Sequence, residues 1–119
     1  MLKMLVMLKR RAGMSREEFM AYYESTHAKL GEKYMHGNAV RYIRRYLTPV
    51  PNPASDETPE AEYDVVTEVW FKDVDQWHSM MRTLSDPKMV ELITEDEKRL
   101  FDRTRIQAYT VAEVESKIS

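Results

Sequence analysis

The chain has 119 residues, a formal net charge of −2 at neutral pH and no cysteine. This length fits a single domain with one hydrophobic core. The lack of cysteine excludes disulfides, thiolate metal sites and a cysteine nucleophile, and is compatible with a reducing cytoplasm. Charges of both signs are interspersed, which argues against nucleic acid as a partner. No apolar run is long enough to cross a bilayer, so we expect no membrane partner.

The residues that commonly bind metals and cofactors are few. The three histidines (His27, His36 and His78) show no metal-binding spacing. The three glycines are too dispersed to form a glycine-rich phosphate loop. The sequence therefore predicts no metal site and no cofactor.

The first predicted helix begins in the segment "MSREEF". Ser15 is a good N-cap, and Glu18, three residues later, completes a capping box. Met14 and Phe19 stand at the two positions of a hydrophobic staple. Gly31 follows the last apolar position of the helix, so we expect the helix to end there, with Gly31 as its C-terminal cap.

The remaining elements alternate along the chain. Segments with the apolar and β-branched character of strands are residues 3–9, 39–47, 62–71 and 103–111. Residues 73–84 have helical spacing, and Asp86-Pro87 opens a further helical piece. Four of the five prolines lie in the loop 48–61, which can hold neither a helix nor a central strand.

This order, β-α-β-β-α-α-β, is that of the ferredoxin-like split βαβ arrangement. It predicts an α+β fold, with one domain over residues 1–119 and a four-stranded antiparallel sheet that carries helices on one face. The first strand is apolar in both alternation phases, so the other face of the sheet also needs cover. A second copy of the same sheet provides it, which predicts a homodimer. The arginines of the second strand leave open which of its faces meets the helices.

The segment "EEFMAYYESTHAKL" resembles the EthD family of the dimeric α/β-barrel superfamily. The pattern is carried by Phe19, Tyr23, His27 and Ala28, and continues through "VRYIRRYL" and "DVVTEVWF" into "DVDQWHSMM". The resemblance covers about residues 3 to 111. It implies a homodimer whose two sheets face each other. It also implies one cavity per subunit, between sheet and helices, for a small hydrophobic or aromatic molecule.

His27 and Tyr23 are the candidate catalytic residues. His27 lies on the inner stripe of the predicted helix, which is compatible with a buried structural histidine. The family motif favours instead an imidazole at the cavity wall that transfers a proton near neutral pH. Tyr23 is four residues earlier on the same face and would orient or share that proton. A tyrosine packed in the core is the alternative.

Further residues are candidates for binding the substrate. Glu68 lies in an apolar strand and needs a partner, either Arg44 or Arg45 of the neighbouring strand or a polar group of the substrate. The full set of predicted substrate-binding residues is Tyr22, Tyr42, Arg44, Glu68 and Trp70.

Three functions agree with this pattern. The first is an EthD-like enzyme of lyase or isomerase type, which would perform a dehydration, decarboxylation or cyclisation on an aromatic or polyketide-like substrate. The second is a cofactor-independent monooxygenase of the same fold, and the third is a non-catalytic ligand-binding accessory protein. Fold alone does not choose among them.

Overall fold

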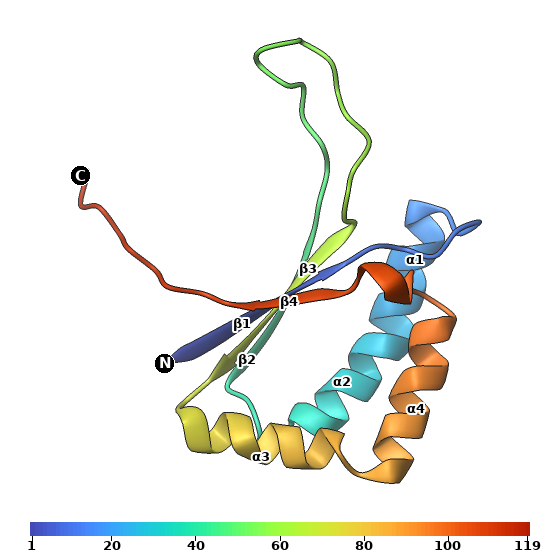
Figure 1. The fold of residues 1–119 in the computed structure, drawn as a ribbon, viewed down its shortest axis with the longest axis vertical. Coiled ribbons are helices and arrows are strands. Elements are labelled where there is room, and N and C mark those ends of the chain that lie inside the picture. Colours follow the sequence, from blue (N-terminus) through green and yellow to red (C-terminus); the bar gives the residue numbers. More distant parts are fainter.

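The computed structural model describes residues 1–119 as one sheet with helices packed on one of its faces (Figure 1). In chain order the elements are β1 (Leu2–Leu8), α1 (Arg16–Tyr22), a π-helical turn (Tyr23–His27), α2 (Ala28–Met35), β2 (Arg41–Tyr46), β3 (Val65–Phe71), α3 (Val74–Leu84), α4 (Pro87–Lys98), a 3₁₀ turn (Arg103–Arg105) and β4 (Gln107–Thr110). The strand order is β2-β3-β1-β4, and all three pairings are antiparallel. The predicted α+β, ferredoxin-like fold is confirmed.

Three of the four strands are shorter than the sequence predicted. β2 covers 41–46 rather than 39–47, β3 covers 65–71 rather than 62–71, and β4 covers only 107–110. The largest difference is in the last strand, where Asp102 accepts a hydrogen bond from the amide of Thr104 and starts the 3₁₀ turn instead. A carboxylate in this position favours a turn over an extended backbone.

The first helical region begins as predicted but does not end at Gly31. Ser15 and Glu18 form the expected capping box, whereas the helix runs on to Met35. Gly31 has an ordinary helical backbone, and its missing side chain makes room for Tyr42: a Cβ there would lie 3.2 Å from Tyr42 Cε2. A glycine inside a helix costs about 1 kcal/mol relative to alanine, so here it serves packing rather than capping.

A π-helical turn interrupts this region at Tyr23–His27. The amide of Ala28 donates to the carbonyl of Tyr23, one residue further back than in an α-helix. The rings of Tyr23 and His27 meet edge to face, with centroids 5.0 Å apart. Both side chains are buried. The two candidate catalytic residues therefore face the interior together.

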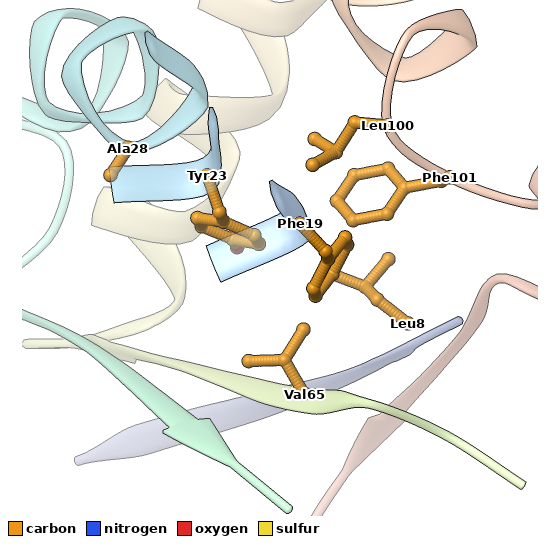
Figure 2. Close-up of a cluster of buried hydrophobic side chains, with 7 residues drawn as sticks. All are labelled: Leu8, Phe19, Tyr23, Ala28, Val65, Leu100 and Phe101. Carbon is orange, nitrogen blue, oxygen red and sulfur yellow. The ribbon is translucent and has the colours of Figure 1, made fainter. Parts of the chain in front are cut away.

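The core lies between these helices and the sheet. Figure 2 shows Phe19 and Tyr23 pointing from the first helical region towards Val65 of β3 and Leu8 of β1. Leu100 and Phe101, just after α4, close the cluster from the side. Phe19 contacts Tyr23 and Phe101 in edge-to-face pairs at 5.9 Å.

The contacts of β2 show which of its side chains face the helices. Tyr42 bonds to Tyr23, and Arg44 and Tyr46 bond to Glu24, so these three residues of β2 face the helices. The residues of the opposite, open face are Lys3, Leu5, Met7, Arg41, Ile43, Arg45, Val66, Glu68, Trp70, Gln107 and Tyr109.

Two segments extend beyond the body of the molecule. The loop between β2 and β3 and the chain after β4 both project away from the sheet, and they flank the side opposite the helices (Figure 1). They help to give the chain extents of 47 × 43 × 22 Å. None of the helices combines the length and the apolar character that crossing a bilayer requires.

Candidate functional site

A cavity of about 190 Å³ lies between the sheet and the helices. Of its sixteen lining residues, thirteen are hydrophobic, and the other three are His27, Thr67 and Glu97. An engineered apolar cavity of about 150 Å³ accepts benzene, so this space suits a molecule of one or two rings. An apolar cavity with a few polar groups at its wall is typical of a small-molecule site.

His27 is held at the cavity wall by a buried carboxylate from α4. Its Nδ1 lies 2.7 Å from Asp96 Oδ2, and only 7% of His27 and 6% of Asp96 are exposed. The other oxygen of Asp96 accepts a hydrogen bond from the Tyr22 hydroxyl at 2.5 Å. Burial and this hydrogen bond raise the pKa of Tyr22, so its hydroxyl remains a donor. Asp96 therefore accepts from two sides.

These two bonds fix the tautomer of the imidazole. Because a carboxylate can only accept, Nδ1 of His27 carries the hydrogen, and Nε2 of the neutral ring keeps its lone pair. Nδ1 is taken by Asp96, so Nε2 is the nitrogen that is free to meet a ligand. When the ring is neutral, the arrangement leaves Nε2 as a base whose conjugate acid is paired with a carboxylate.

Glu97 places a second titratable group at the same cavity. Burial raises the pKa of its carboxyl, and nearby Arg103 and His27 only partly oppose this effect. Arg103 Nε lies 3.5 Å from Glu97 Oε1. His27 and Glu97 are therefore the imidazole and the carboxyl group among the residues that line this cavity. No group of three or more His, Asp or Glu side chains that could hold a metal ion occurs in the structure.

Hydroxyl groups line the sheet side of the cavity. The Tyr23 hydroxyl lies 2.6 Å from Thr67 Oγ1. The Tyr42 hydroxyl donates a hydrogen bond of 3.3 Å to the Tyr23 hydroxyl. Burial raises the pKa of Tyr23 and of Tyr42. Tyr23 contacts His27 only through its ring, so it positions the imidazole by packing.

A family model also matches most of this chain. The model described as the EthD domain matches residues 11–104. The chain belongs to the EthD domain family. No curated protein sequence matches it significantly.

Solved structures with the same fold cover nearly the whole of this EthD domain. A protein of Arabidopsis thaliana has a TM-score of 0.63 at 13% identity, covering 99% of this chain and 100% of its own. A dabb family protein with a ferredoxin-like fold from Mesorhizobium loti has a TM-score of 0.57 at 11% identity, covering 96% and 97%. A dimeric protein of unknown function and ferredoxin-like fold from Bacteroides fragilis has a TM-score of 0.51 at 15% identity, covering 92% and 91%. At these identities the likeness shows the fold alone.

The EthD domain brings three of the predicted site residues together at the cavity. They are His27, Tyr23 and Tyr42. Tyr22 donates to Asp96 and does not line the cavity. Arg44 is held in a two-point pair with Glu24, which also accepts from the Tyr46 hydroxyl at 2.6 Å.

Glu68 and Trp70 lie on the open face of the sheet, away from the cavity. Partial burial raises the pKa of Glu68, but Arg45, whose hydrogen bond is 2.9 Å long, together with the neighbouring Trp70 and Lys3 outweighs this effect, and the pKa is lowered. The ion pair between Glu68 and a neighbouring arginine is thus confirmed. The ring of Trp70 is covered by Lys3 and Arg41, whose charged groups lie 3.9 and 4.4 Å from its centroid.

Sequence reasoning missed four polar residues of this site. Asp96 stands on the inner stripe of α4, three residues after Ile93, where a carboxylate among apolar positions signals a buried partner. Glu97 is one residue further. Thr67 alternates with buried valines, and Tyr34 lies beyond the predicted end of its helix. The complete set is Asp96, Glu97, Thr67 and Tyr34.

Proposed function

We propose that this EthD domain is an enzyme that moves a proton on a small, largely apolar molecule bound in the cavity. The observation that carries the proposal is the buried His27–Asp96 pair at the wall of a cavity of ligand size. Buried titratable pairs of this kind concentrate at functional sites. A structural histidine in a core needs only a partner, whereas this one also lines a space that can hold a ligand.

The chemical step is a proton transfer at Nε2 of His27. The C–H bond next to a carbonyl of the substrate breaks, its proton passes to Nε2, and its electron pair moves into the carbonyl to give an enolate. The imidazolium that forms remains bonded to Asp96 through Nδ1. A carboxylate in this position both orients the ring and stabilises its charged form. Glu97 supplies a second site from which a proton can be returned.

Proton transfer of this kind serves all the lyase and isomerase reactions predicted from the sequence. Removal of a proton starts a dehydration or an aldol-type cyclisation. Return of the proton to a carbanion completes a decarboxylation. The aromatic character of the lining, with Tyr23, Tyr42 and Phe101, favours an aromatic or polyketide-like substrate.

The test is hydrogen exchange into a ketone that binds. Incubation with α-tetralone in deuterium oxide is expected to label the carbon next to the carbonyl faster with the protein than without it. His27→Gln should abolish the acceleration, whereas His78→Gln, which alters an exposed histidine outside the cavity, should keep it. Equal rates for wild type and His27→Gln would overturn the proposal.

The alternative functions are separated in the same experiment. A cofactor-independent monooxygenase would consume oxygen with its substrate, which an oxygen electrode detects. A non-catalytic ligand-binding protein would bind α-tetralone without labelling it. Either outcome would contradict the proton-transfer assignment.

We further propose that the open face of the sheet is the interface of a homodimer. Its centre is apolar, with Leu5, Met7, Ile43 and Val66, and the two projecting segments flank the space in front of it (Figure 1). An apolar face of this extent requires cover in water. Analytical ultracentrifugation should give a dimer for the wild type and a monomer for Val66→Lys. A wild-type monomer at micromolar concentration would contradict this.

A further inference from the structure

Tyr34 lines the cavity, and no hydrogen bond within the chain uses its hydroxyl. The main-chain carbonyl of Tyr34 accepts a hydrogen bond from Asn38 Nδ2 at 2.8 Å, and the phenol takes no part in it. Two buried side-chain atoms of the protein have no hydrogen-bond partner, Asp64 Oδ1 and Trp70 Nε1. The Tyr34 hydroxyl is not one of these fully buried atoms. The hydroxyl oxygen therefore keeps some accessible surface, in a residue that lines the cavity.

The hydroxyls of Tyr42, Tyr23 and Thr67 form a hydrogen-bonded chain, which has one hydrogen without an acceptor in it. Tyr42, Tyr23 and Thr67 contribute three hydroxyl hydrogens but form two hydrogen bonds with one another. Tyr42 donates to Tyr23, and either Tyr23 or Thr67 donates across the other bond. In both arrangements one hydrogen, on Tyr23 or on Thr67, has no acceptor within the chain of hydroxyls. Both residues line the cavity.

These hydroxyls act as donors and not as bases. Burial raises the pKa of Tyr34, as it does for Tyr23 and Tyr42. All three phenols therefore stay protonated at neutral pH. Donors that line a largely apolar space select a ligand with an acceptor oxygen, because an apolar ligand would leave them unpaired.

We propose that Tyr34, together with the free end of the Tyr42–Tyr23–Thr67 chain, is a binding site for a carbonyl oxygen of the ligand. The substrate class is therefore an apolar, ring-sized ketone or quinone-like molecule rather than a hydrocarbon. This inference rests on the proposed function in using the same cavity, but it concerns binding alone. A carbonyl held here has its oxygen among donors that also stabilise the negative charge of an enolate.

The experiment compares two ligands of the same shape, α-tetralone and tetralin, by calorimetry or fluorescence of the folded protein. Tyr34→Phe should weaken α-tetralone binding on the order of tenfold and leave tetralin binding within about twofold. Tyr46→Phe is the matched control, because its hydroxyl bonds to Glu24 outside the cavity, and it should change neither affinity. Thermal unfolding of each variant confirms that the fold is kept.

An infrared measurement gives a second readout. The carbonyl band of bound α-tetralone should lie at lower wavenumber than in hexane, and Tyr34→Phe should shift it back. A band at the hexane position, an unchanged affinity in Tyr34→Phe, or failure of α-tetralone to bind would each overturn the inference. Binding with the expected shift but without hydrogen exchange would refute the proposed catalysis and leave the carbonyl site standing.

Discussion

Replacement of Asp96 by asparagine tests the pair at the centre of the site. Asparagine has the same shape, but its amide offers one acceptor and one donor group, whereas Asp96 accepts from both Tyr22 and His27. If the Tyr22 hydroxyl keeps the amide oxygen, the amide NH₂ faces Nδ1 of His27. The imidazole must then give up its Nδ1 hydrogen and carry it on Nε2 instead.

The energetic cost follows from the two hydrogen bonds. A bond to a charged group contributes about 1.5–3 kcal/mol and a neutral bond about 0.5–1.5 kcal/mol. In Asp96→Asn, both hydrogen bonds change from a bond to a charged group to a neutral bond. The substitution should therefore lower the free energy of unfolding by about 2–3 kcal/mol. For a domain of this size that corresponds to a melting temperature lower by roughly 10 °C.

The assays are urea denaturation and nitrogen-detected NMR of the histidine rings. The wild type should show His27 with its hydrogen on Nδ1, and Asp96→Asn should show it on Nε2, with loss of hydrogen exchange into α-tetralone. Glu95→Gln, an exposed neighbour on the same helix that pairs with Lys98, is the control and should change stability by less than about 0.5 kcal/mol. A wild-type His27 with its hydrogen on Nε2 would refute the reasoning.

Two further predictions concern Gly31 and Glu97. Gly31→Ala should lower the free energy of unfolding despite a helix-propensity gain of about 1 kcal/mol, because the new Cβ would lie 3.3 Å from the Tyr42 hydroxyl oxygen. In a Tyr42→Leu background the same substitution should instead raise the free energy of unfolding. Additive effects of the two substitutions in chemical denaturation would contradict this prediction. Burial raises the pKa of Glu97 above that of the unfolded chain, so its ionisation destabilises the fold as pH rises through the folded-state value. The stability of Glu97→Gln relative to wild type should therefore grow from acidic to neutral pH, and a constant difference in urea titrations at several pH values would refute this.

The order of elements could be predicted because local signals agree with the global fold. The capping box at Ser15, the prolines of the loop and the Asp86-Pro87 helix start each act through neighbouring residues, and each is found in the structure. Gly31 was mistaken for a cap because the same residue type serves two purposes. Only the tertiary contact with Tyr42 tells them apart.

The candidate site could be predicted only in part, since its partners come from distant segments. His27 was identified from one helix, but Asp96 is 69 residues away in sequence. Glu68 looked like a site residue because a carboxylate stands among apolar neighbours. The alternation of β3 places it on the open face, and its inward neighbour Thr67 contributes to the cavity instead. The helices that cover one face of the sheet determine which alternate side chains of β3 point inward.

The measurement that tests the account most directly is a crystal structure of the protein with α-tetralone. The ketone should lie in the cavity between sheet and helices, with the carbon next to its carbonyl in contact with Nε2 of His27. The carbonyl oxygen should lie within hydrogen-bond distance of the Tyr34 hydroxyl. A ligand bound on the open face of the sheet, or one in the cavity with its oxygen against the apolar wall and its ring away from His27, would contradict it.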